Sequence, residues 1–210
     1  MKRIFTFIVV IACFATLSSC TKTESPKSDS NAIDLGLSVK WAACNLGATA
    51  PEEYGQYFAW AEISEKQGYT WSNCKYCSDD YGYEFTKYTG KTDVLQNSDD
   101  AANVLLGNGW RIPTAEEFEE LIKKCKWTLE TVGGHSGYTV TGPNGNSIFL
   151  PFAGFKNEDG FLESGKGGYY WSANIYEYDN SLADDLEITP RTVFVAYFDR
   201  CNGQTIRPVK

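Results

Sequence analysis

One stretch of the chain decides the fold: Trp110-Arg111-Ile112-Pro113-Thr114-Ala115-Glu116-Glu117-Phe118. Thr114 and Glu117 form a capping box, in which the threonine oxygen accepts a hydrogen bond from the third helical amide and the glutamate reaches back. Apolar residues then recur on one helical face, at Phe118, Leu121, Ile122 and Cys125. These patterns predict an amphipathic helix over about 114–125 that docks on a core.

The chain after this helix is typical of antiparallel strands. Two apolar segments, 138–141 and 147–150, flank a Gly-Pro-Asn-Gly turn, which predicts a hairpin. Further strands are expected at 152–155, 160–162, 169–172, 192–198 and 205–209. Because strands and helices do not alternate, a parallel sheet is not expected. The predicted class is α+β, with mainly antiparallel strands, one main helix and long loops.

The chain before the helix begins with an alternation of apolar and polar residues. The apolar positions are Ile33, Leu35, Leu37, Val39 and Trp41. This period of two predicts one half-buried strand over 33–41. Residues 62–95 have little periodicity but many aromatic side chains, so we expect a long loop that packs on itself rather than a disordered segment.

Composition and charge exclude several classes of protein. The formal net charge of the 210 residues is −8. Because the chain has neither an excess of basic residues nor a basic run, we expect no nucleic-acid partner and no polybasic membrane surface. The length fits one domain, or at most two small ones.

The first residues are typical of an exported lipoprotein. A short basic start precedes an apolar run over 4–17, which is too short to cross a bilayer and fits a signal peptide over 1–19. The cleavage region reads Leu17-Ser18-Ser19-Cys20, which resembles the sites that bacterial lipoprotein signal peptidase cleaves. Cys20 is therefore the expected lipidation site, and the membrane is the expected partner through that lipid.

The segment after the lipidation site predicts a spacer. Residues 21–31 contain no large apolar side chain and are rich in Ser, Thr, Lys and Pro, so residues 20–31 are expected to form a lipidated, flexible tether. Residues 32–210 are expected to form a single domain. The predicted location is the cell envelope, as an outer-membrane lipoprotein that faces the periplasm or the cell surface.

Five cysteines follow the lipidation site: Cys44, Cys74, Cys77, Cys125 and Cys201. An exported chain can form disulfides, but five is an odd number, so at least one thiol is free or pairs outside the chain. Cys74 and Cys77 form an isolated CxxC, without the strand–helix pattern of a redox motif and without the second pair that a zinc site requires. A local disulfide or a loop staple is the simplest interpretation of this pair, and the partner of Cys201 stays open.

The Trp-Arg-Ile-Pro-Thr entry to the helix resembles the domain named for the major paralogous family of Fibrobacter succinogenes. Other blocks between residues 32 and 210 are similar to the same family and follow in the same order. They read DLGLSVKWA (34–42), CNLGA (44–48), YGQYFAW (54–60), GYTVTGPNGNSIFLP (137–151), YYWS (169–172) and IRPV (206–209).

This resemblance implies a C-type-lectin-like domain, related to the fold of the formylglycine-generating, sulfatase-modifying enzymes. The first and last strands of such a domain would pair, and long loops would lie on one side. Members of the family are typically exported lipoproteins or surface proteins. The resemblance also implies a disulfide between Cys44 and Cys125, which would tie the first strand region to the end of the helix.

Two departures from related families limit which functional sites the resemblance implies for this chain. The calcium-dependent lectins bind sugar through Glu-Pro-Asn or Gln-Pro-Asp followed by Trp-Asn-Asp, and the nearest string here, Trp-Ser-Ala-Asn at 171–174, lacks the aspartate. The sulfatase-modifying enzymes use two reactive cysteines near the end of the chain, where only Cys201 is present. Neither the calcium–sugar site nor the oxidase chemistry is therefore expected.

Nothing else in the sequence predicts an enzyme, a cofactor or a metal. The single histidine, His135, lies in a glycine-rich turn without a nucleophile motif. The glutamates of the predicted helix are expected to form a solvated face rather than a glycosidase pair. The acidic pairs at 99–100 and 184–185 lack the spacing of an EF-hand.

The aromatic loop within 63–93 is the remaining candidate for a ligand site. Aromatic faces stack on the C–H faces of sugars, and neighbouring carboxylates bind hydroxyl groups. The candidate residues are Trp71, Tyr76, Asp79, Asp80, Tyr81 and Tyr83. The alternative is that these rings pack the loop onto the domain.

We therefore expect a non-catalytic, lipid-anchored envelope protein whose lectin-like head binds a surface glycan or protein. The alternative is a structural or assembly subunit of a fimbrial or outer-membrane complex. The sequence does not distinguish these two functions.

Overall fold

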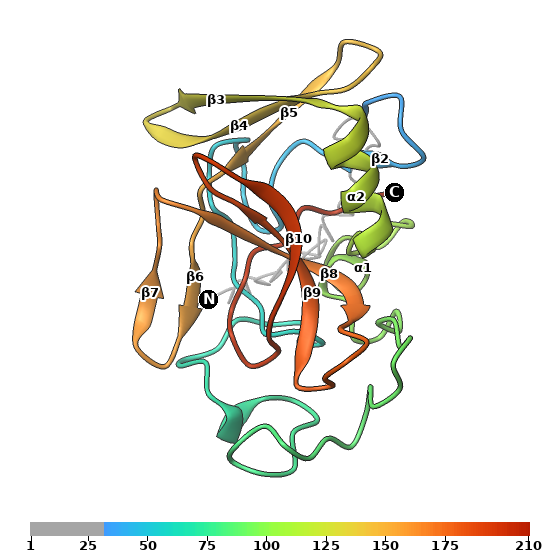
Figure 1. Ribbon diagram of the computed structural model, residues 1–210, viewed down its shortest axis with the longest axis vertical. Helices are drawn as coiled ribbons and strands as arrows, with labels where there is room; N and C mark the ends of the chain where they lie inside the picture. The colour runs from blue at the N-terminus through green and yellow to red at the C-terminus, as the bar shows by residue number, and fades with distance from the viewer. Residues whose placement is uncertain (1–31) are drawn as a thin grey trace, which may run out of the picture.

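The computed structural model describes residues 32–210. The expected leader, the lipidation site at Cys20 and the tether lie outside the described residues. Within 32–210 the chain is mostly antiparallel sheet with few helices, which agrees with the predicted α+β class. Figure 1 shows the larger sheets at the top and centre of the view, and a long run of loop at the bottom.

The predicted helix is present as α2 (Ala115–Lys124). Both bonds of the capping box form: the Thr114 hydroxyl accepts from the Glu117 amide at 3.3 Å, and the Glu117 carboxylate accepts from the Thr114 amide at 2.8 Å. Phe118 and Leu121 are buried on the apolar face of the helix. The sequence prediction of an amphipathic helix that docks on a core is confirmed.

Two antiparallel three-stranded sheets dominate the described residues. One consists of β3 (Lys126–Val132), β4 (His135–Thr141) and β5 (Ser147–Pro151), and the other of β8 (Gly168–Ile175), β9 (Leu182–Ile188) and β10 (Val193–Asp199). The hairpin predicted around the Gly-Pro-Asn-Gly turn is β4–β5. The sequence analysis missed β3 and β9. In β9 two adjacent aspartates break the apolar alternation, although the second, Asp185, is buried.

The segment 33–41 does not form the single strand that was predicted. It is a tight hairpin, in which β1 (Ala32–Asp34) pairs antiparallel with β2 (Lys40–Ala42) and Ile33 faces Trp41. The chain turns after Asp34, whose carboxylate accepts from the amide of Gly36, a residue with a φ of +76° that favours glycine. The alternate apolar side chains still reach one core, so the pattern marks the buried face correctly but does not show where the chain reverses.

The two ends of the described chain pair with each other. The amides of Lys40 and Ala42 donate to the carbonyls of Lys210 and Pro208 at 2.9 and 2.8 Å, and Trp41 forms an antiparallel bridge with Val209. This is the pairing of first and last segments that the resemblance implies. The closing segment 205–209, predicted as a strand, forms isolated bridges to three different parts of the chain and no continuous ladder.

Short elements complete the fold: α1 (Ala101–Leu106), the 3-10 turn η2 (Trp71–Asn73), β6 (Phe155–Asn157) and β7 (Gly160–Leu162). The strand predicted at 152–155 is shifted, because Phe152 and Ala153 are buried in the core and only Phe155 enters β6. The predicted long loop at 62–95 is confirmed, with η2 as its helical turn.

Two arginines are paired in different ways. Arg111, whose side chain is partly exposed, pairs with the carboxylate of Glu117. Arg207 does not: its guanidinium donates to Asn45 Oδ1 at 2.8 Å and to backbone carbonyls. Burial lowers the pKa of Arg207 to about 10, and the carbonyl dipoles stabilise its charge.

Candidate functional site

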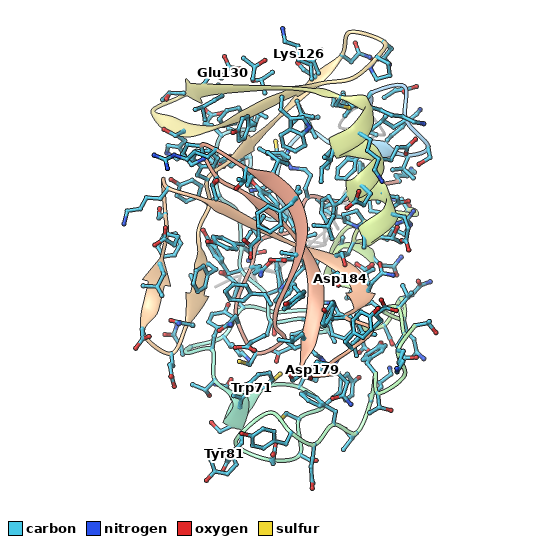
Figure 2. All side chains as sticks on the ribbon, in the orientation of Figure 1. Trp71, Tyr81, Lys126, Glu130, Asp179 and Asp184 are labelled. Atoms are coloured by element: carbon cyan, nitrogen blue, oxygen red, sulfur yellow. The ribbon has the colours of Figure 1, made fainter. Side chains whose placement is uncertain are left out.

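The loop singled out in the sequence lies at one end of the molecule, where Figure 2 labels Trp71 and Tyr81. We call residues 71–88 the tip loop. Its centre is an irregular hairpin: the amide of Ser78 donates to the carbonyl of Glu84, and the amide of Thr86 donates to the carbonyl of Tyr76, both at 2.8 Å. The candidate residues divide into those that build this loop and those that it exposes.

Trp71 belongs to the first group. Its ring is half-buried, lies edge to face with Phe85 at 6.0 Å, and covers the backbone of Gly82. A Cβ atom at Gly82 would lie 2.6 Å from the indole, so the close approach requires glycine. Trp71 therefore helps to pack the loop, while part of its ring stays exposed at a small hollow of about 140 Å³. A ligand contact at this residue stays a prediction.

Asp79 also builds the loop. One carboxylate oxygen accepts hydrogen bonds from the amides of Gly82 and Tyr83 at 3.0 and 3.1 Å and from the thiol of Cys77 at 3.2 Å. Desolvation opposes ionisation, but these bonds outweigh it and lower the pKa of Asp79. The carboxylate thus anchors the turn mainly through one oxygen, while the second oxygen accepts only from the Tyr83 amide at 3.2 Å.

The buried carboxylate of Asp99 attaches the tip loop to the body. It accepts from Lys75 Nζ at 2.7 Å, Lys87 Nζ at 2.5 Å, and the hydroxyls of Tyr76 and Tyr88 at 2.8 and 2.6 Å. Burial alone would raise the pKa of Asp99, yet these four partners hold it well below the usual range. Tyr76 is therefore a structural residue, and Asp99 is occupied by lysine and tyrosine donors rather than free for a metal.

Arg200 closes the base of the loop from the other side. Its buried guanidinium lies over the rings of Phe85 and Trp60, at 4.3 and 4.7 Å from their centroids, and donates to the carbonyl of Asn180 at 2.7 Å. Together with Asp99 it fixes both arms of the tip loop. Both arms of the loop are thus attached to the body by buried side chains.

Three of the six candidate residues remain available to a ligand. Tyr81 and Tyr83 are 72% and 81% exposed, and their rings stack with centroids 6.3 Å apart and an interplanar angle of 27°. Asp80, which precedes them, is exposed as well. Asp80, Tyr81 and Tyr83 are therefore the most exposed of the six, whereas Trp71, Tyr76 and Asp79 are partly buried and make the contacts that hold the loop.

The cysteines of the described residues form no disulfide. All five cysteines within 32–210 are free thiols, so the structure does not contain the disulfide between Cys44 and Cys125 that the resemblance implies, nor a Cys74–Cys77 disulfide. Burial raises the pKa of Cys74 to about 12 and that of Cys201 further, which keeps both protonated and unreactive.

Other features that would indicate catalysis or a metal are missing from the described part of the chain. His135 lies in β4 rather than in a turn, and its Nδ1 contacts the backbone carbonyl of Glu52 at 2.7 Å instead of a carboxylate. Residues 32–210 contain no group of three or more His, Cys, Asp or Glu side chains that could hold a metal ion. Nor does any helix within 32–210 have the length and apolar character needed to cross a bilayer.

Sequence reasoning missed a second surface, which we call the tyrosine groove. It consists of two adjoining hollows of about 520 and 310 Å³. They share Lys91, Tyr176 and Glu177, and they run between the 89–94 segment, the start of α2, the end of β8 and the turn into β9. Figure 2 labels Asp184 and Asp179 beside this groove.

Two tyrosines, Tyr176 and Tyr178, form an aromatic part of the groove wall. Tyr176 stacks on Tyr197 of β10 with ring centroids 4.0 Å apart, and Tyr178 lies edge-on to Tyr176 at 5.4 Å. Tyr178 is 72% exposed. The Tyr-Glu-Tyr alternation at 176–178 was the only signal in the sequence, and it points to a surface only once the register of β8 to β10 is known.

Two polar groups of the groove have no hydrogen-bond partner among the described residues. Burial, then the carboxylates of Glu116 and Glu177, raise the pKa of Asp184 to about 6, and Asp184 forms no hydrogen bond or ion pair within residues 32–210. Asn174 accepts through Oδ1 from the Ala115 amide at 2.9 Å, while its Nδ2 group has no protein acceptor among the described residues. An acceptor and a donor thus lie beside an aromatic wall.

Comparison with family models, with curated proteins and with solved structures gives no match to this chain.

Proposed function

We propose that residues 32–210 form a non-catalytic ligand-binding head, held at the cell envelope by a lipid on Cys20, that binds a surface glycan. The proposal includes the C-type-lectin-like fold and the relationship to the major paralogous domain. The pairing of the first and last segments and the long loops at one end support this fold assignment.

The exposed tyrosine pair at the tip carries the functional part of the proposal. Tyr81 and Tyr83 present more than two thirds of their surface to solvent, and their stacked rings form a joint aromatic surface that a ligand can reach. Asp79 fixes the backbone of Tyr83, and Asp99 fixes the base of the loop, so binding would order little additional chain. Sugar C–H groups pack on such rings, because the ring face carries partial negative charge.

A glycan array tests the proposal when it is probed with the full-length protein and with a variant that carries both Tyr81→Ala and Tyr83→Ala. The proposal predicts binding to at least one saccharide, and a loss of about tenfold or more in the double variant, as for removal of aromatic contact residues. Thr86→Ala on the same loop provides a control that removes no aromatic surface. Binding that is unchanged by the double substitution would rule out the tip as the site.

A structural or assembly role is the second candidate, favoured by the outer edge of β10. This seven-residue strand ends the β8–β9–β10 sheet, and it exposes Phe194 and Tyr197 by 43% and 50%. Long edge strands with exposed apolar side chains are templates for strand addition by another chain. Cross-linking in intact envelopes would support this role if it captures a stable partner at β10. Replacement of Ala196 by proline should then abolish the complex, because proline and the kink it introduces disrupt the edge.

A further inference from the structure

We propose that the tyrosine groove is a second carbohydrate site, which binds a neutral sugar ring against Tyr176 and Tyr178 and its hydroxyl groups at Asp184 and Asn174. The inference rests on the proposed function for the class of ligand, but it assigns a different site and a specificity that the tip does not provide.

The groove has a fixed shape. The 89–94 segment is held against β8, because the amide of Ile175 donates to the carbonyl of Asp93 at 3.0 Å and the amide of Leu95 donates to the carbonyl of Ala173 at 2.9 Å. Asn174 is in turn fixed to the first residue of α2. A hollow of about 520 Å³ bounded by these segments lies within the size range of small-molecule sites.

The aromatic wall gives the sugar a stacking surface. Tyr176 is held by Tyr197, which is the cross-strand neighbour of Asp184 in the β9–β10 ladder. Cross-strand neighbours lie on the same face of a sheet, so the carboxylate of Asp184 and the tyrosine stack belong to one face. Tyr178 extends this wall toward solvent.

The polar groups match the hydroxyl groups of a sugar. An ionised carboxylate accepts only, whereas the amide Nδ2 group donates only, so Asp184 and Asn174 together complement hydroxyls that must both donate and accept. Neither group has another protein partner in the described residues to give up on binding. Binding therefore forms new hydrogen bonds without breaking old ones, and the new bonds offset the cost of desolvating the two groups.

Charge determines which sugars are excluded. Glu116 from α2, Glu177 from the β8–β9 turn and Asp184 from β9 all line the groove, and Lys91 is the one cationic side chain that lines it within residues 32–210. This balance repels carboxylated sugars, because a like charge brought into a polar hollow raises the electrostatic energy. The groove should therefore select neutral saccharides over uronic acids.

The test measures binding of hexasaccharides to the ¹⁵N-labelled full-length protein in detergent by NMR. The probes are neutral hexasaccharides of glucose, mannose and galactose, and a hexasaccharide of galacturonic acid. At least one neutral probe should shift the amides of 174–178, and it should bind about tenfold more tightly than the acidic probe. Failure of all three neutral probes to shift these amides would overturn the proposal.

Variants then separate the groove from the tip and from a folding defect. Tyr178→Ala should weaken the neutral probe by about fivefold to tenfold. Asp184→Asn should weaken binding of the neutral probe and strengthen binding of the acidic probe. Unfolding cannot produce these two opposite changes. Glu187→Gln, which removes the same charge from the opposite face of β9, should leave the affinities for both probes unchanged. Equal effects of Asp184→Asn and Glu187→Gln would contradict the assignment.

The tip variants distinguish this proposal from the proposed function. If the Tyr81→Ala, Tyr83→Ala double variant loses glycan binding while the groove amides never shift, the tip proposal stands and the groove proposal fails. If the groove amides shift as before in that variant, the groove binds independently. A lysine-rich peptide that shifts them more strongly than every saccharide, with the same dependence on Asp184, would replace the sugar assignment with a peptide one.

Discussion

The carboxylate of Asp185 lies 2.7 Å from Nε2 of Gln204, and both side chains are fully buried in the described domain. The second oxygen of Asp185 and the amide oxygen of Gln204 have no hydrogen-bond partner. Burial raises the pKa of Asp185 well above its ordinary value of 3.8, with Glu187 adding to the shift. The pair therefore favours a protonated carboxyl group in the core.

Asp185 should make the folded state less stable as the pH rises. Because its pKa is raised in the folded state, its stabilising effect is complete below about pH 3.8 and is lost as the pH rises through the folded-state value. Asp185→Asn, which is neutral at every pH, should raise the free energy of unfolding at pH 7, because it removes a buried group whose charged form is disfavoured by desolvation.

Denaturant unfolding of the wild type and of Asp185→Asn, compared between pH 4 and pH 7, measures this effect. The advantage of the variant should shrink at pH 4. If the variant is less stable than the wild type, and by the same amount at pH 7 and at pH 4, then Asp185 is not protonated in the core.

Asp99 should govern the order of the tip loop. Asp99→Asn leaves two lysines without their anion, and we expect a loss of about 1–3 kcal/mol, since both lysines are partly exposed and solvent screens their charge. The wild-type contribution has the opposite pH dependence to that of Asp185. The lowered pKa of Asp99 stabilises the fold above about pH 3.8, and this stabilisation disappears as the pH falls through the folded-state value.

Hydrogen exchange of residues 71–88 in Asp99→Asn is the measurement. Exchange should accelerate throughout this segment while β4 and β5 stay protected. Exchange rates in the tip loop equal to those of the wild type would mean that Arg200 and the packing of Trp71 suffice to hold it.

Gly82→Ala should destabilise the tip more than Gly68→Ala does. Both glycines have positive φ, +80° and +73°, so both substitutions include a cost of about 1–2 kcal/mol for the left-handed backbone. Only at Gly82 would the new methyl group meet the ring of Trp71, whereas nothing lies within 4 Å at Gly68. The additional cost is about 1–3 kcal/mol. Thermal unfolding checks the order, and equal losses would show that Trp71 moves freely.

The thiols should differ in reactivity. Burial raises the pKa of Cys74 to about 12, while Cys77 is less buried and its thiol donates to Asp79. Native-state alkylation followed by peptide mass spectrometry should therefore label Cys77 before Cys74 and Cys201. Recovery of Cys74 and Cys77 in one cross-linked peptide before any reduction would contradict the free thiols of the structure.

Local features of this fold could be predicted from the sequence, and features that depend on distant partners could not. Thr114 and Glu117 are three residues apart, so the capping box predicts the start of α2 directly from the sequence. The period of two over 33–41 identifies the buried face but is the same for one strand and for a hairpin, and only the pairing of Ile33 with Trp41 distinguishes them.

The candidate site shows the same division. The sequence located the aromatic loop, but it gave Trp71 and Tyr81 equal weight. They differ because Trp71 covers Gly82, whereas Tyr81 contacts only the equally exposed Tyr83 among the described rings. The tyrosine groove was missed because Tyr176, Asp184 and Tyr197 meet only through the register of β9 and β10.

Radical footprinting of Tyr81 and Tyr83 tests the central claim most directly. The full-length protein in detergent is exposed to hydroxyl radicals with and without saturating envelope polysaccharide, and oxidation of each tyrosine is counted by mass spectrometry. A glycan-binding head predicts strong protection of Tyr81 and Tyr83 by the polysaccharide, with Phe194 on β10 unchanged. Oxidation of both tyrosines at the same rate with and without polysaccharide, together with protection of Phe194 by envelope protein, would contradict it and favour the assembly role.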